Sequence, residues 1–132
     1  MTMHTVSTPD APRPKGHYSQ AIVHGGVVYV AGQLAIDPQD PDAAPGDAGA
    51  QTRLIFRNIA AILDAAGSSL SRLLQVTIYV SDIGSWPAVN EAFAEALGDH
   101  RPTRAIVPVS TIAPGRDVEV VAIAAVDEDR IG

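Results

Sequence analysis

The 132-residue chain contains no cysteine. Disulfides, thiolate metal sites and cysteine nucleophiles are therefore excluded, which fits a reducing compartment. One lysine and eight arginines stand against fifteen acidic residues, and the net charge of −6 does not favour binding to phosphate backbones. No apolar run approaches the ~20 residues that span a bilayer, and the first residues lack the apolar core of a secretory signal. We expect a cytoplasmic protein with neither nucleic-acid nor membrane partners.

The length of the chain predicts one domain. Residues 1–17 are polar and contain three prolines, so we interpret them as an extended arm, with the domain proper beginning near Tyr18. A chain of this size can bury a core without the help of a metal ion. We therefore expect a single domain over residues 1–132.

Apolar periodicity predicts five strands and two helices. The expected strands are residues 18–23, 27–32, 73–80, 103–110 and 118–126, and the expected helices are residues 50–66 and 86–97. This β-β-α-β-α-β-β order indicates an α+β fold in which both helices lie on one face of a mixed sheet. Pro108 has no N–H to donate, so we expect it at a sheet edge or a bulge.

The last expected strand, residues 118–126, is apolar on both faces apart from Glu119. A strand that is apolar on both sides is buried on both sides. Since the helices cover only one face, we expect a second subunit on the other face. A long loop folded over the sheet is the alternative.

Arg104 and Glu119 are the candidate site residues. If residues 103–110 pair antiparallel with residues 118–126, the two side chains fall on neighbouring rungs. A guanidinium group can hold a substrate carboxylate, and a nearby carboxylate can position or deprotonate a water molecule. The alternatives are a structural ion pair and a solvated Glu119 at a frayed strand end.

Other chemistry finds little support in the sequence. The four histidines lack the spacing of metal ligands, and the chain has neither a G-x-S-x-G elbow nor a phosphate- or dinucleotide-binding fingerprint. We expect no metal ion and no cofactor.

Seven stretches in order resemble the Rid family, the reactive intermediate/imine deaminases formerly called YjgF proteins. The first is Gly16-His17-Tyr18-Ser19-Gln20-Ala21, which resembles the G-P-Y-S-Q-A opening of that family. The others are Val30-Ala31-Gly32-Gln33, the helix from Gln51 to Gly67, Thr77-Ile78-Tyr79-Val80-Ser81-Asp82, Val89-Asn90, Pro102-Thr103-Arg104 and Val118-Glu119-Val120. The resemblance covers about residues 12–126.

The resemblance implies a chorismate-mutase-like fold, a homotrimer and sites in the clefts between subunits. It also implies cofactor-independent hydrolysis of 2-imino acids, such as the tautomer of 2-aminoacrylate, to 2-keto acids and ammonia. By residue, it implies that Arg104 clamps the substrate carboxylate, that Glu119 orients the attacking water, and that Tyr18, Gly32, Asn90 and Ile106 line the pocket.

The chain departs from the family pattern at three positions. His17 stands in place of a proline, Ile106 in place of a cysteine and Val121 in place of a second glutamate. Two other functions are alternatives to deamination: a non-catalytic trimer that binds carboxylate metabolites and regulates a partner, and a ribonuclease or translation inhibitor. The net charge of −6 argues against the last of these.

Overall fold

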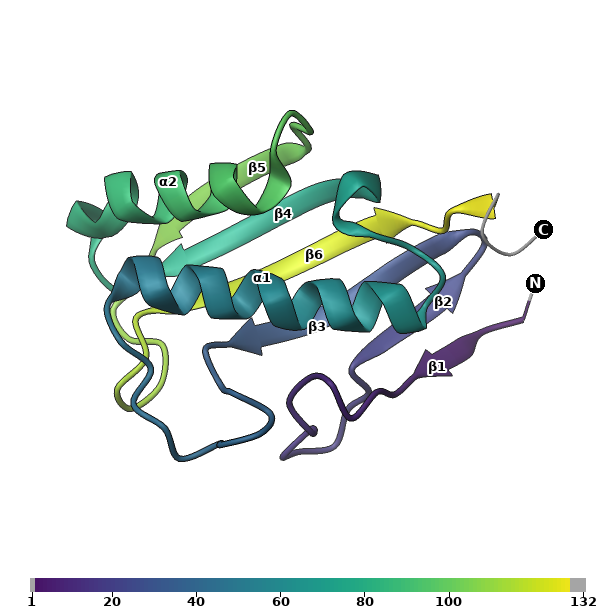
Figure 1. Ribbon diagram of the computed structural model, residues 1–132, viewed down its shortest axis with the longest axis horizontal. Helices are drawn as coiled ribbons and strands as arrows, with labels where there is room; N and C mark the ends of the chain where they lie inside the picture. The colour runs from purple at the N-terminus through teal and green to yellow at the C-terminus, as the bar shows by residue number, and fades with distance from the viewer. Residues whose placement is uncertain (1, 129–132) are drawn as a thin grey trace.

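The structure, a computed structural model, describes residues 2–128 and is built from one sheet and two helices (Figure 1). The strands are β1 (His4–Val6), β2 (Ala21–His24), β3 (Val27–Leu34), β4 (Leu73–Val80), β5 (Thr103–Pro108) and β6 (Val118–Ala125). The helices are α1 (Ala48–Ala65) and α2 (Trp86–Leu97), with the short 3-10 helices η1 (Leu70–Arg72) and η2 (Ile83–Ser85) before β4 and α2.

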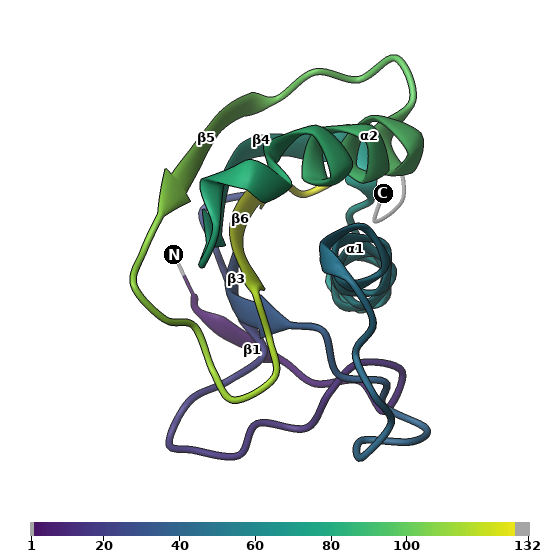
Figure 2. The ribbon, with the colours of Figure 1, turned by 90° about the vertical axis from the view of Figure 1, so that its left-hand side faces the viewer.

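The sheet is mixed, and its strand order is β1-β2-β3-β6-β4-β5. The β4–β5 pair is parallel and the other neighbouring pairs are antiparallel. Both helices lie on one side of the curved sheet (Figure 2). The predicted α+β arrangement, with both helices on one face, is therefore confirmed.

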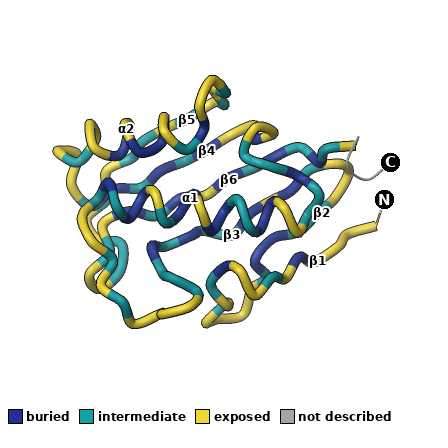
Figure 3. The backbone as a smooth tube through the Cα atoms, viewed as in Figure 1, coloured by how far each residue is buried: buried dark blue, intermediate teal, exposed yellow. Residues whose placement is uncertain are grey.

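The core lies between the sheet and the helices. Ile55, Ile59 and Ile62 recur at helical spacing on α1 and are fully buried, and the buried positions run along the inner side of the helices and through the sheet (Figure 3). Phe56 of α1 meets Phe93 of α2 edge to face, with ring centroids 5.4 Å apart. Aromatic contacts of this kind fix how two elements pack.

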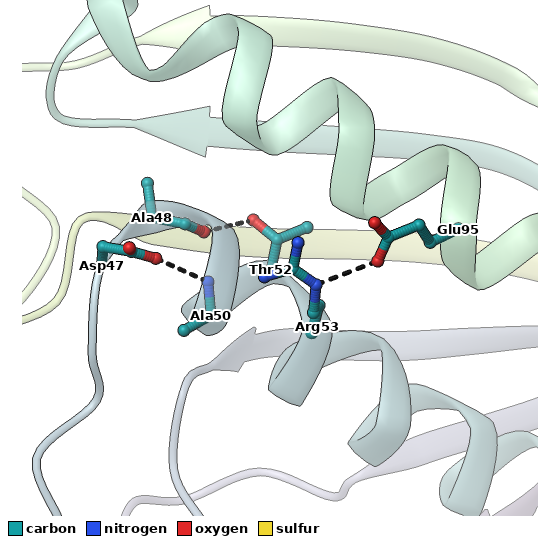
Figure 4. A network of polar contacts seen from close by, with 6 residues as sticks. All are labelled: Asp47, Ala48, Ala50, Thr52, Arg53 and Glu95. Atoms are coloured by element: carbon teal, nitrogen blue, oxygen red, sulfur yellow. Dashed lines mark hydrogen bonds and ion pairs between the residues drawn. The ribbon is translucent and has the colours of Figure 1, made fainter.

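Polar contacts fix the start of α1 and its position against α2 (Figure 4). The Asp47 carboxylate caps the helix by accepting a hydrogen bond from the Ala50 N–H at 2.9 Å, which satisfies one of the free N–H groups of the first turn. One turn on, Arg53 Nε donates to Glu95 Oε2 of α2 at 3.0 Å. The helix pair therefore carries an exposed ion pair outside its apolar contact.

The N-terminal arm belongs to the domain, so the expected domain start near Tyr18 is wrong. Strand β1 extends the sheet by pairing with β2, and Val6 and Ala11 are buried in the core. The buried Gln20 side chain fastens the arm: its Oε1 accepts from the Thr8 N–H at 2.7 Å, and its Nε2 donates to the Thr8 and Pro12 carbonyls, each at 3.0 Å. A buried amide with its hydrogen bonds satisfied holds a loop in one conformation.

Strands β5 and β6 are not neighbours, which corrects the expected antiparallel pairing of these two strands. Strand β4 lies between them, parallel to β5 and antiparallel to β6. Strand β5 consequently forms an edge of the sheet and is bonded only to β4. The neighbouring Val109 N–H donates to Val80 of β4, so the missing N–H of Pro108 falls on the free side and removes no hydrogen bond between strands. The prediction for Pro108 is confirmed.

The face of the sheet opposite the helices, the open face, is uncovered in the single chain. Strands β3 and β6 present mainly apolar side chains to it, with Glu119 as the charged exception, and β4 presents Gln75, Thr77 and Tyr79. The side chains of this face alternate with the buried ones along β3, β4 and β6, and Tyr29 and Val121 are 48% and 37% exposed. No described segment shields these residues, so the alternative of a covering loop is wrong. The expected second subunit remains a prediction.

Candidate functional site

The six residues named from the sequence fall into two groups. Arg104, Asn90 and Ile106 lie on the helix side of the sheet, around α2 and β5. Glu119 lies on the open face, and Gly32 lies against its carboxylate. Tyr18 precedes β2 and shares a pocket with Gly32.

Arg104 is held between α2 and the sheet. It pairs in register with Val76 of β4, a fully buried residue, which places its side chain on the helix side. Its Nη1 donates to Asn90 Oδ1 at 2.7 Å. Its guanidinium carbon lies 5.0 Å from the ring centroid of Phe93 and 5.7 Å from that of Trp86. Contacts of a cation with aromatic faces within ~6 Å are attractive, so hydrogen bonding and packing both orient this guanidinium group.

Much of the hydrogen-bonding capacity of Arg104 is unused. A guanidinium group has five N–H donors, and Asn90 is the one side-chain acceptor that Arg104 contacts within residues 2–128. No carboxylate of that range forms an ion pair with it, since the single ion pair found there joins Arg53 to Glu95. The alternative of a structural ion pair between Arg104 and Glu119 is therefore wrong for the single chain, and Arg104 is available to bind an anion.

A pocket of about 560 Å³ adjoins the Arg104 side chain. It is lined by the C-terminal half of α2 and the segment that leads into β5, and Arg101 adds a second positive charge to it. Ile106 follows Arg104 on the same side of β5 and packs against the core. It is not among the residues that line this pocket in the single chain, so its predicted role in the pocket wall stays a prediction.

Glu119 lies close to the backbone of β3. It pairs with Tyr79 of β4 and Leu34 of β3 on the open face, and a Cβ placed on Gly32 would lie only 2.9 Å from Glu119 Oε1. A side chain at position 32 would therefore push the Glu119 carboxylate out of this position. Within residues 2–128, Glu119 has neither a hydrogen bond nor an ion pair of its own.

Tyr18 and Gly32 line a smaller pocket of about 140 Å³, together with Arg13, Lys15 and Gln20. Tyr18 is 55% exposed and lies in the turn before β2. Its N–H donates to the Gly16 carbonyl at 3.1 Å, so the turn forms with His17 in place of the proline of the family pattern. The pocket and the Glu119 carboxylate share Gly32 as a common wall.

The two groups are far apart within one chain. Arg104 lies on the rung of Val76 and Glu119 on the rung of Tyr79, two strands away. That separation is roughly 10 Å along the strands and roughly 10 Å across them, and the two side chains point to opposite faces. A single subunit therefore does not bring the guanidinium and the carboxylate to one ligand.

Three residues near the site were missed from the sequence. Trp86 and Phe93, which lie in the expected helix of residues 86–97, flank Arg104, and Tyr79 lies across from Glu119. The spacing Trp86-x3-Asn90-x2-Phe93 places these three side chains on one helix face. This spacing was the signal in the sequence that could have identified Trp86 and Phe93 as neighbours of Asn90. Within the described part of the chain, no cluster of three His, Asp or Glu side chains could hold a metal ion.

Comparison with known proteins decides the family. The family model described as Endoribonuclease L-PSP matches residues 8–126. The chain belongs to this family, the Rid family. The resemblance carried by the sequence motifs is thus confirmed.

Three relatives show the breadth of the family. A RutC family protein of Pyrococcus horikoshii is 42% identical over 119 residues, 90% of this chain and 94% of the relative. The 2-iminobutanoate/2-iminopropanoate deaminase of Rattus norvegicus is 32% identical over 119 residues, 90% of this chain and 87% of the enzyme. The crystal structure of E. coli TdcF with bound serine is 30% identical with a TM-score of 0.87, covering 92% of this chain and 98% of that one.

No described helix is long and apolar enough to cross a membrane.

Proposed function

We propose that this Rid protein is an imine deaminase that hydrolyses 2-imino acids of the 2-aminoacrylate type to 2-keto acids and ammonia. The observation that carries the proposal is the Arg104 guanidinium group, which Asn90, Trp86 and Phe93 orient and which no carboxylate of the described chain neutralises. A planar group prepared in this way matches the bidentate geometry of a carboxylate. The rat relative named as a 2-iminobutanoate/2-iminopropanoate deaminase supports the same reaction.

The reaction requires little of the protein. The protonated C=N carbon of an imino acid is electrophilic, so water adds to C2 once the substrate is held in place. In the proposed mechanism Glu119 orients the water and accepts its proton as the C–O bond forms. The proton then passes to the amine nitrogen and the C–N bond breaks. The hydroxyl proton passes through Glu119 to the departing ammonia, so the carbonyl of the 2-keto acid forms and ammonia leaves as ammonium. No electrons are exchanged with any other group.

The proposed site is shared between subunits. Arg104 and Glu119 lie on opposite faces of one sheet, so the Arg104 of one subunit would act with the Glu119 of a neighbouring subunit. The uncovered apolar side chains of the open face, which include Tyr29 and Val121, support association of copies. We propose a homotrimer, as the family resemblance implies.

The test is a coupled assay in which an amino-acid oxidase or dehydratase generates the imine and keto-acid release is timed with and without this protein. We expect the wild type to accelerate release. The Glu119→Gln variant should lower turnover by about 10²–10⁴-fold, the usual contribution of general-base assistance. Binding of a 2-keto acid, measured by calorimetry, should survive, because Arg104 still holds the carboxylate.

The same pair of measurements separates catalysis from the alternative of a non-catalytic carboxylate-binding module. Binding does not need Glu119, so a pure binder would hold the 2-keto acid but leave the imine at its uncatalysed rate of hydrolysis. The E. coli TdcF structure contains bound serine, so a related protein binds a small carboxylate, as this alternative requires. Wild-type turnover in the Glu119→Gln variant would refute the proposed role of Glu119.

A further inference from the structure

Two cations gather at the pocket that contains Tyr18 and Gly32. Arg13 and Lys15 both line this pocket of about 140 Å³, and both also line the adjoining pocket of about 390 Å³. The chain has only nine lysines and arginines and a net charge of −6. Two of these nine cations, including the single lysine, thus lie beside a wall of the proposed active site.

Within the described residues no acidic side chain forms an ion pair with Arg13 or Lys15, since the one such pair joins Arg53 to Glu95. The neighbouring loop after Ile36 contributes Pro38 and Pro41, not its aspartates, to the adjoining pocket. Both cations are exposed, so their charge is directed to solvent and to any molecule in the pocket. They are therefore unlike Arg53, whose charge is paired with Glu95 on the protein surface.

The backbone that carries the two cations is fixed. Pro12 and Pro14 alternate with Arg13 and Lys15 and restrict the backbone of this segment. The buried Gln20 amide binds the Pro12 carbonyl at 3.0 Å and ties the segment to the start of β2. The two positive side chains therefore project from an ordered segment, and a ligand would not have to order that segment first.

We propose that Arg13 and Lys15 select imino acids with a second carboxylate, that is, the imines of acidic amino acids such as 2-iminoglutarate. This inference rests on the proposed deaminase function and names its substrate class. Arg104 would hold the carboxylate next to the C=N bond, and the Arg13–Lys15 pair would hold the side-chain carboxylate from the side of Tyr18 and Gly32. A monocarboxylic imine such as 2-iminobutanoate has no group for these cations to bind.

The experiment compares two imines in the wild type and in two double variants. Oxidases generate 2-iminoglutarate from glutamate and 2-iminobutanoate from 2-aminobutanoate, and the enzymatic rate is measured in competition with semicarbazide. The test variant is Arg13→Gln/Lys15→Gln. The matched control is Arg57→Gln/Arg72→Gln, which removes the same charge from exposed positions that line neither of the two pockets.

We expect the kcat/KM of the test variant on 2-iminoglutarate to be about three- to tenfold lower than that of the wild type, and its rate on 2-iminobutanoate to be unchanged. The effect is small because each of the two lost contacts is a solvent-exposed charge pair. The control should leave the ratio of the two rates unchanged. Because exposed charges are screened beyond about 10 Å at 0.1 M salt, added salt should reduce the wild-type preference for 2-iminoglutarate and have no such effect in the test variant.

An unchanged ratio of the two rates in the test variant would overturn the inference, whether both rates stay at the wild-type level or fall equally. An equal fall would give the cations a general role in the fold or in substrate binding. If neither imine is hydrolysed faster than without protein, the deaminase proposal fails, and calorimetry still decides the inference. The wild type should then bind 2-oxoglutarate more tightly than 2-oxobutanoate, and the test variant should lose that difference. Equal binding of the two acids by the wild type would refute it.

Discussion

Replacing Arg104 with lysine tests whether the shape of the guanidinium group, and not only its charge, holds the substrate. A lysine keeps the positive charge but loses the planar fork that can bind a carboxylate through two N–H groups while also donating to Asn90. One hydrogen bond to a charged partner is worth about 1.5–3 kcal/mol. We therefore expect kcat/KM to fall by about 10- to 150-fold if the Lys variant forms one such bond fewer.

Three measurements make the Arg104→Lys result decisive. Thermal unfolding should show that the variant is folded, and the imine assay should place it near Arg104→Ala in activity. Arg101→Lys is the matched control, since Arg101 lines the same pocket but has no hydrogen bond to Asn90. If the Arg104→Lys variant hydrolyses imines at the wild-type rate, bidentate clamping is the wrong role for this residue.

Further predictions concern the open face, the Gly32 contact and the helix pair. Light scattering should give about three times the mass of one chain, and Val121→Asp on the open face should lower that mass, because it places a charge in the proposed interface; a wild-type monomer would contradict the proposed assembly. Gly32→Ala should leave the melting temperature nearly unchanged but reduce turnover by about 10²-fold, because its Cβ would meet Glu119 Oε1 at 2.9 Å and displace the carboxylate; full activity would refute this. The hydrogen bond and charge of Arg53 hold the pKa of Glu95 below its ordinary value of 4.5, so NMR should find that pKa raised in Arg53→Gln. The ion pair is complete above pH 4.5 and is lost as the pH falls through the lowered pKa, so acid should reduce the stability difference between wild type and Arg53→Gln.

The local structure of this chain followed from its sequence where each element carries its own signal. The helical spacing of Ile55, Ile59 and Ile62 predicted a helix over residues 50–66, and α1 spans Ala48–Ala65, just before Gly67 at φ +79°. Strand β1 was missed because three residues in a polar, proline-containing segment show no usable alternation. They become a strand only because β2 offers a free edge and Gln20 fastens the segment that follows.

The pairing of strands that are distant in the sequence could not be predicted from local patterns. Consecutive strands are often neighbours, and on that basis β5 was paired with β6. In the structure β4 separates them, and the registers on β4 place Arg104 on the helix side, beside Val76, and Glu119 on the open face, beside Tyr79. The family resemblance named both residues, but the partners of Arg104 on α2 and the contact of Glu119 with Gly32 depend on tertiary packing.

The apolar side chains of the open face and the unpaired Glu119 impose opposite requirements on whatever covers the sheet. Burying Tyr29 and Val121 is favourable, but burying a carboxylate without a hydrogen-bond donor is costly. Glu119 lies on the same face, against Gly32, and within residues 2–128 it has no donor of its own. A second subunit that covers this face must therefore supply a donor to Glu119 or leave a hydrated cavity beside it. The proposed mechanism needs both features, because the attacking water occupies that cavity and the neighbouring subunit brings the Arg104 group that holds the substrate.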